Sequence, residues 1–193
     1  GTQVQNVSGG PVDISYTYFP DGGGTVGPFT VNGVADGASA NFFMGSLAGI
    51  PAGSFGSATI TATGDVVAVT NDKGTSDGLE RVTTYACFGS GSTLVNVPQS
   101  KEHFGGNTTG IQIQNVGGSA TTVTLDYKAT NGQSLVIEST APVAPGSSIN
   151  VVNLYKLPNA TWSVNSGTPA NMVNTLSGVV VTGTSDLAVI ANE

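Results

Sequence analysis

The residues that most often carry enzyme chemistry are scarce in this chain. His103 and Cys87 are its only histidine and its only cysteine. A nucleophilic triad or a cysteine–histidine site would have to use them, and His103 lies in a glycine-containing segment with no strand-to-helix nucleophile turn. One histidine and one cysteine also cannot supply the three or four ligands of a usual zinc site. The sequence therefore predicts a protein that is not an enzyme and that has no cofactor.

The acidic residues offer little more. No pair of glutamates stands in a recognisable arrangement for glycoside hydrolysis; the four lie at positions 80, 102, 138 and 193. Asp72, Asp77 and Glu80 crowd one loop, and oxygen atoms of this kind are the ligands that Ca²⁺ takes. The spacing is not that of an EF-hand, so we interpret the segment as a solvated acidic loop and keep these three residues as the calcium candidates.

Composition narrows the possible partners. Only 9% of the residues are charged, the formal net charge is −7, and the five basic residues are scattered, which argues against a nucleic-acid partner. No apolar run approaches the roughly 20 residues of a spanning helix, so no membrane span is expected. Cys87 has no partner for an intrachain disulfide, and we interpret it as a buried thiol; the alternative is a reactive or intermolecular one. The surface, rich in Thr, Ser, Asn and Gly and poor in Lys, is typical of an extracellular protein.

The chain repeats itself. The segment 2–7 (TQVQNV) returns as 111–116 (IQIQNV), and 65–71 (DVVAVTN) returns as 186–192 (DLAVIAN). Val4 corresponds to Ile113, an offset of 109 positions, which is the size of one small β-sandwich domain.

Period-two alternation indicates β-strands throughout. Residues 12–18 (VDISYTY) and 122–127 (TVTLDY) alternate apolar and polar side chains, and each follows the Gln-Asn-Val strand after a short turn. We therefore expect each copy to open with a hairpin. Gly, Pro and β-branched residues interrupt every candidate helix, and only a short helical turn near 168–173 is expected.

The copies are unequal. The first continues after Asn71 through residues 79–98, whereas a single residue follows Asn192, so the second copy lacks a counterpart to one or two strands. The segment 79–98 could be a connector, the chain could be a fragment of a longer array, or a strand of another molecule could fill the gap. The second copy also carries about a dozen extra residues around 162–175.

A family resemblance rests on the order of these motifs: Ile-Gln-Ile-Gln-Asn-Val, an alternating strand ending in Tyr, Pro-Gly-Ser-Ser, Leu-Pro and Asp-Leu-Ala-Val-Ile-Ala-Asn. This order resembles tandem immunoglobulin-like repeats of secreted bacterial cell-surface proteins. The resemblance implies an all-β chain of two tandem immunoglobulin-like antiparallel β-sandwich domains, 1–105 and 106–193, and an extracellular scaffold or adhesive role. It supplies no catalytic residues.

Duplication without reactive groups, together with strands at both chain ends, favours a structural subunit that self-assembles by strand or edge pairing into a filament, sheath or surface layer. A strand of one subunit would complete the second domain of its neighbour. The expected donors are the first strand, 2–7, and the segment 82–97; the residues that represent them are Val4, Val7, Val82, Tyr85, Leu94 and Val95.

The alternative is an adhesin or carbohydrate-binding module that presents loops from a rigid scaffold. Trp162, in the inserted segment of the second copy, is then the ligand candidate, because an exposed indole could stack on a glycan. Three Asn-x-Ser/Thr sequons occur, and Asn107 and Asn159 are the glycosylation candidates because they fall in expected loops, whereas Asn6 lies beside a strand. An enzyme is the third possibility.

Overall fold

The protein folds as β-strands and short connections. The computed structural model describes residues 1–21, 23–76 and 79–193, without the side chains of 75, 76 and 79–81. Over these residues it contains fourteen strands, three short 3-10 helices and no α-helix, which confirms the expected all-β class. Two compact units divide between Gly89 and Ser90. The division falls earlier than the expected boundary near residue 105, because residues 92–102 pair with strands of the second unit.

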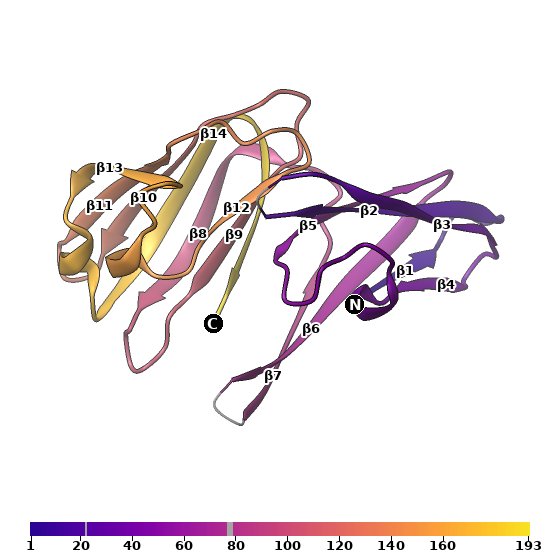
Figure 1. Cartoon of the computed structure of the whole chain (residues 1–193), viewed down its shortest axis with the longest axis horizontal. Helices are drawn as coiled ribbons and strands as arrows, with labels where there is room; N and C mark the ends of the chain where they lie inside the picture. The colour runs from indigo at the N-terminus through magenta and orange to yellow at the C-terminus, as the bar shows by residue number, and fades with distance from the viewer. Residues whose placement is uncertain (22, 77–78) are drawn as a thin grey trace. The chain divides into compact units, whose positions relative to one another are not determined.

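Unit 1 (Gly1–Gly89) consists of two antiparallel sheets, with strand orders β4-β1-β6-β7 and β3-β2-β5 (Figure 1). The strands are β1 (Thr2–Asn6), β2 (Val12–Pro20), β3 (Val26–Val34), β4 (Ser39–Phe42), β5 (Gly56–Ala62), β6 (Val66–Ser76) and β7 (Leu79–Ala86), with a short helix η1 (Met44–Ser46) after β4.

The core of unit 1 lies between these two sheets. Val4 of β1 and Ile14 of β2 are fully buried in it, and the rings of Tyr16 and Phe42 stack with centroids 5.0 Å apart. The alternation of β2 therefore directs its apolar face inward, as predicted. The expected opening hairpin was wrong: β1 pairs with β4 and β6, whereas β2 pairs with β3 and β5. The turn after Asn6 carries the chain from one sheet to the other.

Unit 2 (Ser90–Glu193) repeats this layout with one long shared strand. Its strands are β8 (Ser92–Glu102), β9 (Gly110–Asn115), β10 (Val123–Ala129), β11 (Ser134–Ser139), β12 (Ser148–Val151), β13 (Trp162–Gly167) and β14 (Thr175–Asn192), and its 3-10 helices are η2 (Leu154–Lys156) and η3 (Pro169–Met172). The first half of β14 pairs with β10 and the second half with β9, so β14 belongs to both layers. The helix η3 confirms the short turn expected near 168–173.

Among the described strands, unit 2 has no counterpart of β7, which pairs with β6 in unit 1, but it contains β8 at a place that has no equivalent in unit 1. The strand β8 runs antiparallel along β14, with Val97 opposite Val179 and Glu102 opposite Thr175, on the side of β14 away from β10 (Figure 1). A strand of the same chain thus covers the outer side of the first half of β14. The comparison of the two copies missed this strand because β8 precedes its repeat, whereas the gap was sought after Asn192.

The insertion of the second copy also closes its core. The strand β13 pairs with β11, and the first residue of β13, Trp162, belongs to the core of unit 2, as does Met172 of η3. Both side chains are buried, and no aromatic or methionine of unit 1 stands at a matching place in the sequence. The insertion is therefore a structural addition to unit 2.

One buried asparagine recurs in each unit. The Asn115 amide donates to the carbonyl oxygens of Ser119 (2.7 Å) and Val143 (2.8 Å), and its Oδ1 accepts the Gly117 N–H (3.0 Å). Asn6 does the same in unit 1 with the carbonyls of Gly10 and Val34. Both side chains are fully buried and fully hydrogen-bonded, which is the condition for placing an amide in a core.

Replacing Asn115 with alanine should destabilise unit 2 by about 2–3 kcal/mol, because three hydrogen bonds of a buried amide are lost, although the Val143 carbonyl and the Gly117 N–H keep backbone partners. Trp162 is the only tryptophan and lies in unit 2, so urea unfolding followed by its fluorescence measures the loss. The matched control is Asn165→Ala, an exposed asparagine of β13, which should change the free energy of unfolding by less than about 0.5 kcal/mol. Equal effects of the two substitutions would contradict the structural role of Asn115.

Candidate functional site

The reactive residues do not come together. Cys87 is half-buried just after β7, and its Sγ lies 3.7 Å from the Thr70 hydroxyl in unit 1, whereas His103 belongs to unit 2. No group of three or more His, Cys, Asp or Glu side chains that could hold a metal occurs among the described residues. Of the calcium candidates, Asp72 lies exposed on β6, Asp77 is outside the described residues, and only the backbone of Glu80 is described.

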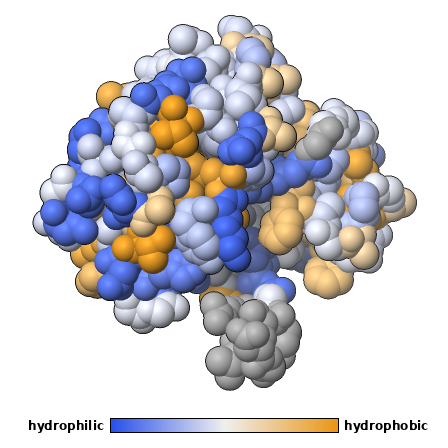
Figure 2. All heavy atoms as spheres, turned by 60° about the vertical axis from the view of Figure 1, so that its left-hand side comes forward, coloured by the Kyte–Doolittle hydropathy of each residue, from blue (hydrophilic) through white to orange (hydrophobic). Residues whose placement is uncertain are grey.

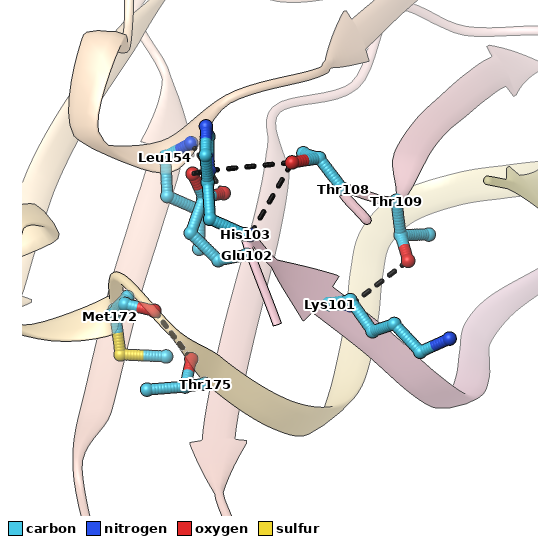
Figure 3. A network of polar contacts seen from close by, with 8 residues as sticks. All are labelled: Lys101, Glu102, His103, Thr108, Thr109, Leu154, Met172 and Thr175. Atoms are coloured by element: carbon cyan, nitrogen blue, oxygen red, sulfur yellow. Dashed lines mark hydrogen bonds and ion pairs between the residues drawn. The ribbon is translucent and has the colours of Figure 1, made fainter. Parts of the chain in front are cut away.

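Several polar contacts meet in the Glu102 cluster, formed by Glu102, His103, Thr108, Leu154 and Tyr155, of which Figure 3 shows the first four. Glu102, at the end of β8, is only 4% exposed. Its Oε2 accepts the Leu154 N–H (2.9 Å), and its Oε1 lies 3.0 Å from His103 Nδ1. The Tyr155 ring meets the imidazole edge-on, with centroids 5.0 Å apart. The cluster thus ties the end of β8 to η2.

Burial perturbs several tyrosines. The Tyr127 hydroxyl lies deep in unit 2, and its pKa is raised above the usual value first by burial and then by the negative charge of Glu102. In unit 1, burial raises the pKa of Tyr16 to about 12, and burial followed by the charge of Asp72 raises the pKa of Tyr85 to about 12. These hydroxyls stay protonated at neutral pH, so they act as packed polar groups and not as bases.

The contacts of the Glu102 cluster are of the kind that hold a turn in place. The Thr108 hydroxyl lies 3.3 Å from His103 Nδ1 and also accepts the His103 backbone N–H. That arrangement fixes the turn after β8. The structural role of Glu102 was missed in the sequence because its partner, Leu154, lies far away along the chain.

The candidate ligand residue of the sequence analysis, Trp162, is placed differently from the expectation. Its ring is 2% exposed, and its Nε1 donates to the Asn150 carbonyl (3.0 Å). A buried indole offers no face on which a sugar could stack, so this prediction is corrected. The alternating pattern around Trp162 could not distinguish an inward from an outward ring. Asn107 and Asn159, the glycosylation candidates, are both exposed, whereas Asn6 is buried.

The proposed donor strands are already paired. The strand β1 lies between β4 and β6 and places Val4 in the core, and β8 is held by β14. Residues 82–86 belong to β7, which pairs with β6, so donation of 2–7 or 82–97 would require these pairs to break first. The other residues named as donor candidates lie on or beside these strands. Val7 is exposed just after β1. On β7 and β8, Val82 and Leu94 are exposed, and Tyr85 and Val95 are half-buried.

The open edges of the sheet β3-β2-β5 differ in how they are protected. The edge strand β3 contains Pro28, which has no N–H, and glycines at 27 and 33 beside register irregularities with β2. Features of this kind block further pairing at a sheet edge. The opposite edge, β5, has the sequence GSATITA, without proline or charge, and its register with β2 is unbroken from residue 56 to 62. The strand β5 is therefore competent to pair.

The geometry of β5 shows which groups are free to pair. The Thr63 N–H donates to the Asp13 carbonyl (3.1 Å) and so points toward β2. Backbone groups alternate sides along a strand, so the N–H groups of Ala58, Ile60 and Ala62 point away from β2. No described strand pairs with β5 on that side. The side chains of these three residues pack against the core of unit 1 but remain half-exposed.

The space-filling view shows a surface that is mixed and not divided into polar and apolar halves. On the face that comes forward in Figure 2, small apolar groups alternate with hydrophilic ones. Exposed apolar side chains occur in both units, among them Phe43, Phe55 and Val67 of unit 1. Within the described part of the chain, no helix has the length and apolar character needed to cross a membrane.

Comparisons with known proteins give little. No protein-family model matches the chain, and no curated protein matches it. Among solved structures it is similar to the Anabaena sensory rhodopsin transducer, at 12% identity and a TM-score of 0.38, over 53% of this chain and 96% of that one. A likeness this low carries no argument about function.

Removing the Glu102 carboxylate should loosen the end of β8. We expect Glu102→Ala to destabilise unit 2 by about 1–3 kcal/mol, because the Leu154 N–H is left without an acceptor in a buried place. Glu102→Gln keeps an acceptor oxygen and should cost much less. Both are measured by urea unfolding with Trp162 fluorescence. If the glutamine variant is as unstable as the alanine variant, the Leu154 hydrogen bond does not account for the effect.

High pH should unfold unit 2 through Tyr127. The pKa of this hydroxyl is higher in the folded state than its unfolded value of about 10. The protonated hydroxyl therefore makes its full contribution to the free energy of unfolding below about pH 10, and this contribution is lost as the pH rises further. The urea midpoint reported by Trp162 should be flat from pH 7 to 9 and fall above pH 10. Tyr127→Phe should reduce this fall, whereas Tyr16→Phe, in unit 1, should leave it unchanged. An unchanged fall in Tyr127→Phe would contradict this assignment.

Proposed function

We propose that this protein is an extracellular structural subunit that self-assembles by pairing of sheet edges into a filament, sheath or surface layer. The observation that carries the proposal is the edge of β5, which is open, uncharged and free of proline. Soluble proteins commonly protect such edges with charges, prolines or covering segments, because an open edge recruits further strands. An unprotected edge in a protein of low charge favours association.

The repeated architecture supports a structural role. The chain contains two units, and each has a buried asparagine with the same hydrogen bonds. The Glu102 cluster, for its part, connects the end of a strand to a turn. Repetition lets one kind of contact recur along an assembly. The mechanism differs from donation of β1 or β8, which are paired in their own units, and relies on the free edge of β5.

The proposal includes repeats of the immunoglobulin-like kind as a two-layer architecture. In immunoglobulin domains the second and third strands belong to different sheets, whereas β2 and β3 of unit 1 pair in one sheet. The likeness is therefore proposed for the stacked antiparallel layers and for the tandem arrangement, and not for the order of the strands.

The extracellular location is part of this proposal. It is supported by a surface that depends on hydroxyl and amide groups, with charged residues at only 9%, and by exposed sequon asparagines at 107 and 159. The competing function, an adhesin or carbohydrate-binding module, rested on Trp162, and the burial of that ring removes its ligand candidate.

Edge-mediated assembly predicts a charge-sensitive association. The purified chain should associate with rising concentration in sedimentation velocity and form regular assemblies in negative-stain images. Thr61→Lys places a charge on the exposed face of β5 and should shift association to at least about tenfold higher concentration. The matched control is Asn32→Lys, with the same charge change on β3 of the same sheet, which should leave association unchanged.

Two results would contradict the proposed function. One is a chain that stays monomeric at every concentration tested. The other is an equal loss of association in Thr61→Lys and Asn32→Lys, which would indicate a general effect of charge and not pairing at β5. Circular dichroism of both variants checks that the strands are retained.

A further inference from the structure

The duplication allows the open edge of unit 1 to be compared with its filled equivalent in unit 2. Tyr16 pairs with Ile60, and the corresponding Leu125 pairs with Val181. Tyr18 pairs with Ala58, and Tyr127 pairs with Val179. The strand β5 therefore corresponds, residue by residue, to the first half of β14.

The two equivalent strands differ in what lies on their outer side. The first half of β14 is covered by β8, with Val95 opposite Val181 and Val97 opposite Val179. The strand β5 has no described partner there. The burial follows this difference: Val181 and Val179 are 0% and 2% exposed, whereas Ile60 and Ala58 at the same positions are half-exposed.

The backbone groups match as well. The Leu176 carbonyl accepts the Thr130 N–H from the β10 side, so by alternation the N–H groups of Val179 and Val181 point to β8. The N–H groups of Ala58 and Ile60 point outward from β5 in the same way. The edge of unit 1 thus presents the hydrogen-bonding pattern that β8 satisfies in unit 2, beside apolar side chains that β8 would cover.

We propose that the outer edge of β5 is a binding site for one extended polypeptide segment of the β8 type, paired antiparallel in the register that β8 adopts on β14. The occupant is uncharged and carries small aliphatic side chains at alternate positions, as residues 92–98 (STLVNVP) do. This inference rests on the proposed function, because it specifies the kind of segment that would pair with β5 during assembly.

The sequence of β8 indicates that no further strand would pair on the outer side of the occupant. Val95 lies opposite Val181 and therefore faces β14, so the backbone of Asn96 and Pro98 faces outward. Pro98 has no N–H to offer on that outer side, and a further strand could not pair fully there. An occupant with the same sequence pattern would close the sheet of unit 1 and stop its growth at a single added strand.

The β8 strand of the same chain does not fill this role. It is held by β14 along its length and by the Glu102 cluster at its end, and its removal would expose Val179 and Val181. The occupant is accordingly a segment of similar sequence pattern in a neighbouring molecule, and not the β8 strand of the same chain.

The test uses the full chain and a synthetic peptide of residues 91–100 with blocked ends. Backbone amide exchange is followed residue by residue by NMR. At saturating peptide, the amides of Ala58, Ile60 and Ala62 should exchange about tenfold or more slowly, while those of β3 at the opposite edge stay unchanged.

N-methylated peptides supply the matched controls. Methylation at Val95 removes an N–H that faces the acceptor strand and should abolish the protection of β5, whereas methylation at Asn96 alters an outward N–H and should leave it intact. The inference is overturned if the unmodified peptide does not protect β5, if the two methylated peptides act alike, or if protection changes only at Val179 and Val181, which would mean exchange with β8.

The peptide experiment and the assembly experiment can reject the two proposals independently. A chain that stays monomeric but binds the peptide at β5 rejects self-assembly and retains the site. A chain that assembles but leaves β5 unprotected by the peptide retains self-assembly and rejects the site.

Discussion

Within each unit, one buried asparagine amide is hydrogen-bonded to the chain at two crossings between the layers. Asn6 bonds to carbonyls in the turn from β1 to β2 and at the end of β3, the two points where the chain of unit 1 passes from one sheet to the other. Asn115 does the same before β10 and after β11. Regular strand pairing ends where the chain leaves a sheet, and buried carbonyl groups there still need hydrogen-bond donors. One asparagine side chain donates to carbonyls at both crossings of its unit and so ties them together, beside the Thr121 N–H that the Val143 carbonyl also accepts.

The two units then diverge around this shared frame. Unit 2 adds β8 along β14 and β13 beside β11, and its apolar residues on β14 become fully buried. Unit 1 has neither addition, and the residues at the same positions of β5 stay half-exposed. The first half of β14 is therefore covered on both sides, whereas β5 has a described partner on one side only. Under the proposed function, this unequal covering of the two copies would separate stability from association within one chain.

The sequence predicted the part of this structure that depends on local pattern. Alternation placed β2 and β10 and their buried faces, and the repeated Gln-Asn-Val segments located both copies. It did not predict the sheet to which β2 belongs, because a turn of five residues serves a hairpin and a crossing equally well. The partner of β14 was missed since β8 precedes its repeat. Trp162 was misplaced because one aromatic in an unmatched insertion has no second copy to show its direction.

The pairing of β8 with β14 also determines how unit 2 responds to tension. Ser92, where β8 begins, lies opposite Leu187, close to Asn192, where β14 ends. These two strands run in opposite directions, so their outer ends emerge at one end of the sheet. A pull between Ser92 and Asn192 would load the pairs of residues 187–192 with β9 as well, and would separate β8 from β14 one hydrogen bond after another.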